Sequence, residues 1–111
     1  MKLLIVLNED NGINSRLGFH FGRSPFFGIY DTNSKELKII KNIIDHSKNQ
    51  TPVDQINSLG IDMVYTQGMG RKAYDLFKNK DVILKTGNYE TLKEVIDNID
   101  NLKDLKEDNT H

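Results

Sequence analysis

Residues 3–7 are five consecutive apolar residues, and this run constrains the fold more than any other part of the chain. Successive side chains of a strand point to opposite faces of a sheet, so a strand made from this run is apolar on both faces. Such a strand has to be covered on both sides, as the central strands of α/β sheets are. The run is too short for a signal-peptide core and for the about 20 residues of a membrane-spanning helix. We therefore expect a cytoplasmic α/β protein with no membrane partner.

The composition describes one domain without a strong overall charge. The chain has 111 residues, with 15 Lys and Arg against 16 Asp and Glu, and it has no Cys. A net charge of −1 creates no field that would hold a polyanion, so we expect no nucleic-acid partner. Without Cys the chain cannot form disulfides or thiolate-ligated zinc and iron-sulfur sites. A metal would need His, carboxylate or backbone ligands.

The remaining apolar patterns predict four more strands and three helices. We expect strands at 26–31, 36–44, 61–66 and 82–84, and helices at 51–60, 69–79 and 92–102. Thr51 is the expected N-cap of the first helix, and Thr86 or Asn88 that of the last. Residues 1–102 are predicted to form a single domain, and the charged tail at 103–111 is expected to fray.

The order of these elements predicts how the sheet is built. Strands that alternate with helices require parallel pairing through right-handed crossovers. With the hairpin at 26–44 beside the first strand, the sheet is a five-stranded mixed one of order 3-2-1-4-5, in which strand 2 is antiparallel and helices cover both faces. The loops at 9–25 and 67–70 then meet at one edge, beside the first strand, where the strand order reverses. Ligands of open α/β sheets bind at such a switch point.

Both loops carry cations next to glycine. The candidate binding residues are Arg16, His20, Gly22 and Arg23 in the first loop, and Gly68, Met69, Gly70 and Arg71 in the second. Amide groups at a helix start favour an anion, and glycine lets a ligand approach the backbone, so we expect an anionic ligand. The same residues also have a plain structural interpretation, as a surface His and packing glycines. The aromatic residues Phe19, Phe21, Phe26 and Phe27 are expected to fill the core.

No arrangement of residues in the sequence predicts catalysis. The chain has neither GxxxxGK[ST] nor GxGxxG, so classical nucleotide binding has no support. A two-metal nuclease on this sheet would need carboxylates within the first strand, which has none before Glu9. The serines lack an identifiable general base. We therefore expect a protein that is not an enzyme.

Two linked segments resemble the motifs of one family. The segment GFHFGRSPFFGIYD at 18–31 resembles the HFGR-(A/S)-x-x-F-x-(I/V)-x-D opening of the dinitrogenase iron-molybdenum cofactor biosynthesis family. The segment LGIDMVYTQGMGRKA at 59–73 resembles its GVDVVI-x-G-(M/I)-G-x-x-A motif, and YETLKEV at 89–95 resembles its last helix. The resemblance covers residues 2–100.

The resemblance implies a ribonuclease H-like, three-layer α/β/α fold without nuclease activity, in a nitrogenase accessory factor-like protein. It further implies transient binding of an iron-molybdenum cofactor or an iron-sulfur precursor cluster. By motif position His20 and Arg23 would contact this cluster, and Gly22, Gly68, Met69 and Gly70 would shape its pocket. Relatives often present Cys, His or Gly-rich residues in the loop after the third strand, where this chain offers His46 as a possible metal ligand.

Three hypotheses of function follow. The leading one is a carrier or chaperone for an iron-sulfur or iron-molybdenum type cluster, in which His20 donates to metal, Arg16, Arg23 and Arg71 neutralise charge, and cluster-assembly proteins are the partners. The alternative is a regulatory module that binds a small organic or phosphate-containing anion at the same edge. The third is a scaffold that dimerises through an exposed strand.

Overall fold

The apolar run at the N-terminus forms β1 (Lys2–Leu7), in the interior of a single sheet. The computed structural model describes residues 1–45, 47, 49–106 and 110. Every side chain from position 3 to position 7 is fully buried. The interpretation of this run as a strand covered on both faces is confirmed.

The sheet has the order β3-β2-β1-β4-β5-β6. Its strands after β1 are β2 (Phe26–Asp31), β3 (Leu37–Lys41), β4 (Met63–Tyr65), β5 (Ile83–Thr86) and β6 (Lys103–Asp104). The pairs β1/β4 and β4/β5 are parallel, whereas β1/β2, β2/β3 and β5/β6 are antiparallel. The predicted order of the first five strands, with β2 antiparallel, is therefore confirmed.

The prediction of five strands is wrong, because the chain adds β6 at the far edge of the sheet. Lys103 pairs with Thr86, and Asp104 pairs with Lys85. The next residue, Leu105, is buried, and its backbone N–H donates to the carbonyl of Leu84 at 3.0 Å. Residues 103–105 thus belong to the sheet and its core, while the expected fraying of the tail at 103–111 stays a prediction. A strand of two charged residues carries no apolar alternation by which it could be predicted.

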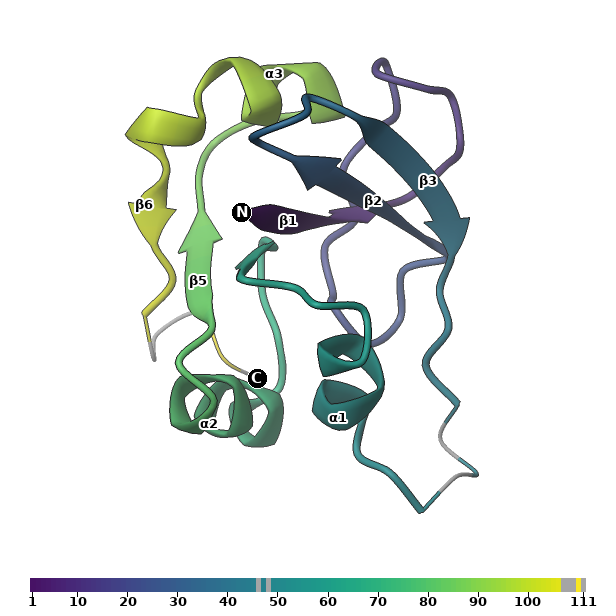
Figure 1. Cartoon of the computed structure of the whole chain (residues 1–111), viewed down its shortest axis with the longest axis vertical. Helices are drawn as coiled ribbons and strands as arrows, with labels where there is room; N and C mark the ends of the chain where they lie inside the picture. Colours follow the sequence, from purple (N-terminus) through teal and green to yellow (C-terminus); the bar gives the residue numbers. More distant parts are fainter. Residues whose placement is uncertain (46, 48, 107–109, 111) are drawn as a thin grey trace.

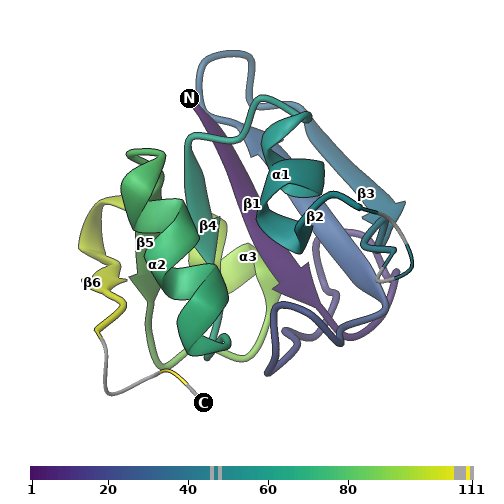
Figure 2. The same ribbon diagram turned by 90° about the horizontal axis from the view of Figure 1, so that it is seen from below.

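Helices cover both faces of the sheet. α1 (Pro52–Asn57) and α2 (Arg71–Asn79) lie on one face, and α3 (Leu92–Asp97) with a short 3-10 turn (Ile99–Asn101) lies on the other (Figure 1). Figure 2 shows α1 and α2 next to each other in front of the sheet, with α3 behind it. The ribonuclease H-like classification stays an expectation. None of the helices among the described residues is long and apolar enough to cross a membrane.

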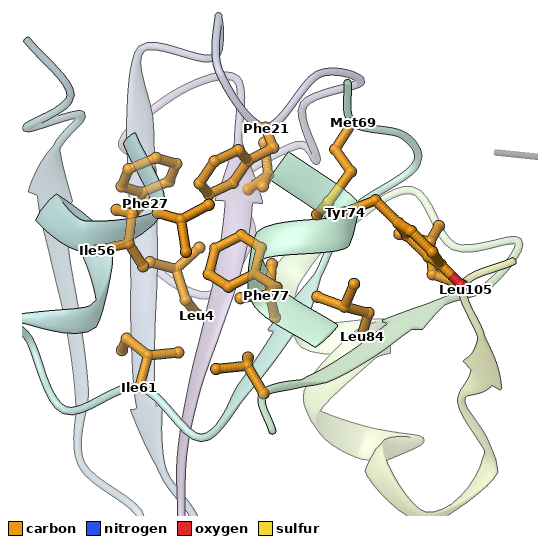
Figure 3. Close-up of a cluster of buried hydrophobic side chains, with 14 residues drawn as sticks. Leu4, Phe21, Phe27, Ile56, Ile61, Met69, Tyr74, Phe77, Leu84 and Leu105 are labelled. Atoms are coloured by element: carbon orange, nitrogen blue, oxygen red, sulfur yellow. The ribbon is translucent and has the colours of Figure 1, made fainter. Parts of the chain in front are cut away.

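The two faces of the sheet have separate hydrophobic cores. The core under α1 and α2 includes Leu4, Val6, Phe21, Phe27, Ile56, Met69, Phe77 and Leu105 (Figure 3). The core under α3 includes Leu3, Ile5, Leu7, Tyr65, Leu92 and Val95. The ring of Phe21 stacks on Phe27 at 5.9 Å and meets Phe77 edge-on at 5.3 Å. An aromatic residue of the long first loop is therefore an anchor of the first core.

The N-cap residue predicted from the sequence is confirmed for α1 and wrong for α3. The Thr51 hydroxyl accepts a hydrogen bond from the backbone N–H of Asp54 at 3.1 Å, with Pro52 as the first helical residue. The N-cap of α3 is Thr91, and not Thr86 or Asn88, because β5 extends to Thr86 and delays the helix. Thr91 accepts from the N–H of Glu94, and its hydroxyl donates to the Glu94 carboxylate at 3.1 Å.

Candidate functional site

Main-chain hydrogen bonds fix the long first loop, at residues 8–25, to the elements around it. The N–H of Asn8 donates to the carbonyl of Arg16 at 2.8 Å, and the N–H of Gly18 donates to that of Val6 at 2.9 Å. The N–H of Leu17 donates to the carbonyl of Glu90, just before α3, at 3.0 Å. The loop is thereby held against β1 and against the start of α3, at the carboxyl edge of the sheet.

One further hydrogen bond joins the two loops that carry the candidate residues. The N–H of Phe21 donates to the carbonyl of Gly68 at 3.2 Å. Below this bond the side chains of Phe21 and Met69 are both buried, and Figure 3 shows them at the same end of the core cluster. The predicted meeting of the two loops at one edge is thus observed. The thioether of Met69 faces the core, so Met69 would support a binding site at this edge from its buried side.

His20 and Arg23 are exposed on one tight turn of the first loop. The N–H groups of Arg23 and Ser24 both donate to the carbonyl of His20, at 3.2 and 3.1 Å, and the Ser24 hydroxyl donates to the same oxygen at 2.9 Å. Gly22 lies between them and does not have a positive φ. A Cβ atom added at Gly22 would meet nothing within 4 Å. The turn therefore presents an imidazole, a guanidinium and an open stretch of backbone together.

The second loop ends at the start of α2. Gly70 is the N-cap and makes no side-chain capping bond, and a Cβ atom added there would also meet nothing within 4 Å. Arg71, in the first turn, forms an ion pair with Asp75 one turn later, at 3.3 Å. Both side chains are about half exposed, at 54% and 56%, so the carboxylate screens part of the cation's charge. Arg71 is thus a weaker contributor to a positive edge than its sequence position indicates.

Arg16 belongs to a separate hollow, which we call the cleft. The cleft has a volume of about 360 Å³ and is lined by Asn8, Arg16, Leu17, Phe19, Gln67, Tyr89 and Glu90. These residues follow β1, β4 and β5, so the cleft lies at the carboxyl edge of the sheet, as predicted for a switch point. Of the predicted site residues that the structure describes, Arg16 lines the cleft and the others do not.

A partly buried hydrogen-bond network lies next to the cleft. The Tyr65 hydroxyl donates to the carbonyl of Gly87 at 3.1 Å, and the Gln67 amide donates to the same carbonyl at 3.1 Å and to the Tyr65 hydroxyl at 3.3 Å. Burial raises the pKa of Tyr65 to about 12, so its hydroxyl stays protonated and acts as a donor at neutral pH. The network fixes Gln67 at the cleft wall.

The sequence did not indicate the aromatic residues of the cleft. Phe21 and Phe27 are buried and Phe26 packs against the core, as expected, but Phe19 is 74% exposed, so its assignment to the core is wrong. The only sequence signal was its place between Gly18 and His20 in a loop. Tyr89 and Gln67 lie within the segments at 89–95 and 59–73 that resemble the family, but nothing in the sequence singled them out as site residues.

Metal ligands do not converge in the part of the chain that the structure describes. No three side chains of His, Cys, Asp or Glu come close enough within it to hold a metal ion. The predicted ligand His46 lies outside the described residues.

Comparisons with known proteins place the chain in a family. The family described as dinitrogenase iron-molybdenum cofactor matches residues 1–102. An uncharacterized protein of Methanocaldococcus jannaschii is 32% identical over 89 residues, which are 75% of each chain. The crystal structure of the protein PH0822 is similar at a TM-score of 0.78, with 27% identity over 96% of this chain and 98% of that one.

A further similar structure shows the same fold. It is an NMR structure of a Thermotoga protein assigned by name to the NifB proteins and the DUF35 family. Its TM-score is 0.77, with 24% identity over 94% of this chain and 92% of that one. The family match over nearly the whole chain agrees with the two motifs and with the mixed sheet on which they meet. The chain belongs to the dinitrogenase iron-molybdenum cofactor family.

Proposed function

We propose that this protein is a non-catalytic carrier or chaperone for an iron-sulfur or iron-molybdenum type cluster. The observation that carries the proposal is the hydrogen bond from the N–H of Phe21 to the carbonyl of Gly68, which joins the two family motifs at one edge of the sheet. Membership of the family relates the chain to the iron-molybdenum cofactor. The cluster is cargo, taken up from and delivered to cluster-assembly proteins in the cytoplasm.

The residues at this edge suit an anionic cargo. His20 offers an imidazole as metal ligand, and Arg23, on the same exposed turn, neutralises negative charge. Gly22 and Gly70 leave open space in which a bulky cluster can approach the main chain. The partly screened Arg71 adds positive charge beside this surface, whereas Arg16, which was also expected to neutralise charge, lines the cleft instead. His46 is a second candidate ligand.

The metal-ligating groups that the chain offers also suit the transfer of a cluster to another protein. The chain has no Cys, so a cluster would be attached through imidazole and charge instead of thiolate bonds. Fewer and weaker attachments give a shorter residence time, because affinity differences between related complexes lie mostly in the dissociation rate. A carrier needs such a residence time to release its cargo to the next protein.

The test is anaerobic reconstitution with the purified iron-molybdenum cofactor, followed by gel filtration, visible absorbance and metal analysis of the protein fraction. We expect the wild type to retain iron and molybdenum, and His20→Ala and Arg23→Gln to retain much less. Lys38→Gln is the matched control, because Lys38 is an exposed cation on β3, paired with Ile29 and away from this edge. Equal retention by His20→Ala and the wild type would remove the ligand role of His20.

A second candidate is a regulatory module that binds a small organic or phosphate-containing anion. The start of α2 favours it, because the N-cap Gly70 supplies no side-chain acceptor for the first N–H groups of the helix. Inorganic phosphate should then raise the melting temperature of the metal-free protein. Gly70→Asp, which places a carboxylate at the cap, should abolish that rise. Unchanged melting of the wild type in phosphate would count against this candidate.

A further inference from the structure

We propose that the cleft binds a small aromatic zwitterion, the chemical class to which the aromatic amino acids belong. This proposal goes beyond the cargo role and does not rest on it, because His20 and Arg23 do not line the cleft. A volume of about 360 Å³ falls within the usual range of small-molecule sites. The position at the switch point of the sheet is also where such sites occur.

The first argument is the charge of the lining. Arg16 and Glu90 place one cation and one carboxylate on the cleft, and the other lining side chains are neutral. A cleft without net charge does not favour a cluster with several negative charges. It matches a ligand with one charge of each sign, because Arg16 can bind a carboxylate in a bidentate manner and Glu90 can accept from an ammonium group.

The second argument is the hydrogen bonding of the Gln67 side chain. Its side-chain amide nitrogen donates two hydrogen bonds, to the carbonyl of Gly87 and to the hydroxyl of Tyr65. These bonds fix the orientation of the amide and leave its carbonyl oxygen as the group that can serve a ligand. A carbonyl oxygen accepts hydrogen bonds, so it adds a second acceptor for an ammonium group beside Glu90.

The third argument is the way in which the aromatic wall is held. Phe19 is exposed, yet the backbone on both sides of it is fixed, by the bonds from Gly18 to Val6 and from Phe21 to Gly68. Tyr89 packs against the buried ring of Tyr65, with 6.5 Å between the ring centroids. A large apolar side chain presented on a fixed backbone is prepared for a contact, because the backbone that carries it has little conformational entropy left to lose on binding. Aromatic rings at these two positions favour an aromatic ligand.

The probe for the test is L-tryptophan, because the protein has no Trp and the indole emission therefore comes from the probe alone. Fluorescence anisotropy is measured with excitation at the red edge of the indole band, where tyrosine does not absorb. We expect a saturable rise with a Kd of about 1 mM or lower. Indole-3-propionate lacks the ammonium group, tryptamine lacks the carboxylate, and both should bind about tenfold more weakly.

Substitutions of residues that line the cleft test whether L-tryptophan binds there. Arg16→Gln, Glu90→Gln and Phe19→Ala should each weaken L-tryptophan binding about tenfold, since each removes one recognised group. Lys38→Gln, on the edge strand β3 and outside the lining of the cleft, should bind as the wild type does. Absence of a saturable signal for the wild type overturns the proposal. Equal affinity for tryptamine and L-tryptophan overturns the role of Arg16, and binding that survives all three cleft substitutions overturns the location.

Discussion

At the scale of the residue, Gly18 determines the shape of the first loop. A Cβ atom at this position would meet the Ser24 hydroxyl, and would lie 2.9 Å from Ser24 Cβ and 3.1 Å from Val6 Cγ1. The close approach lets the N–H of Gly18 reach the carbonyl of Val6. Only glycine lets the loop lie this close to β1 while the turn at 20–24 folds over it.

We predict that Gly18→Ala destabilises the protein by about 1–3 kcal/mol, because the added methyl group overpacks a fixed contact. Urea unfolding, followed by circular dichroism, measures the change. Gly22→Ala is the matched control in the same loop, and its stability should stay within about 0.5 kcal/mol of the wild type, since its methyl group enters open space. If the two variants were equally stable, the close approach at Gly18 would have no energetic importance.

The same control has a second use for the proposed carrier. A Cβ atom at Gly22 fills space that a bound cluster would need. Gly22→Ala should therefore fold normally but retain less iron and molybdenum after reconstitution. Full retention would show that the cluster does not approach the backbone at this turn.

At the scale of the element, α1 depends on its first residues. The helix has six residues, which is too few to be stable without tertiary contacts and caps. Thr51 accepts from the N–H of Asp54, and its hydroxyl donates to the Asp54 carboxylate at 2.9 Å. The Thr51 hydroxyl, together with Lys80 at 3.2 Å, holds the pKa of Asp54 below its usual value. One side chain thus caps the helix and stabilises the charge in its first turn.

We predict that Thr51→Ala lowers the free energy of unfolding by about 1 kcal/mol through loss of the cap, and that Thr51→Ser largely restores it. The pKa of Asp54, followed by NMR titration, should rise in Thr51→Ala. A carboxyl group whose pKa is lower in the folded state stabilises the protein at pH values above its ordinary pKa. This stabilisation is lost as the pH falls through the folded-state pKa. Thr51→Ala should therefore lose less stability on acidification than the wild type does. An unchanged Asp54 pKa would contradict the role of the hydrogen bond from the Thr51 hydroxyl to the Asp54 carboxylate.

At the scale of the whole molecule, the sheet determines stability, and Tyr65 lies in its interior. Tyr65 pairs with Ile5 of β1 and with Lys85 of β5, and its side chain is fully buried. Its pKa of about 12 exceeds the ordinary value of 10.0. The folded state therefore keeps the Tyr65 proton between pH 10 and pH 12, where the unfolded state loses it.

We predict that this difference makes the wild type less stable as pH rises above 10, by up to about 1.4 kcal/mol per pH unit from Tyr65. Tyr65→Phe removes this contribution, so its free energy of unfolding should fall less steeply between pH 10 and pH 11, although it starts lower because a hydrogen bond to Gly87 is lost. Urea unfolding at several pH values gives both slopes. Parallel slopes would show that Tyr65 is not the group responsible.

The order of the sheet could be predicted, because the apolar run of β1, the hairpin and the crossover rule leave few arrangements. The meeting of the loops at Phe21 and Gly68 followed from that order. The sequence could not reveal β6, since Lys103 and Asp104 carry no apolar pattern. Nor could it predict that Phe19 is exposed, because pattern rules assign aromatic residues to a core, and the bonds that hold Phe19 outside are formed by main-chain atoms.

Apart from the glycine required at position 18, the first loop is held in place largely by main-chain hydrogen bonds, including those at Asn8, Leu17 and Phe21. Main-chain bonds are formed by almost any residue, so the outward-facing side chains of the loop can change while its path is preserved. Natural divergence could therefore alter the ligand of this protein without remaking its scaffold. For the same reason, positions 16, 19, 20 and 23 are suitable sites for substitutions that engineer new binding specificities.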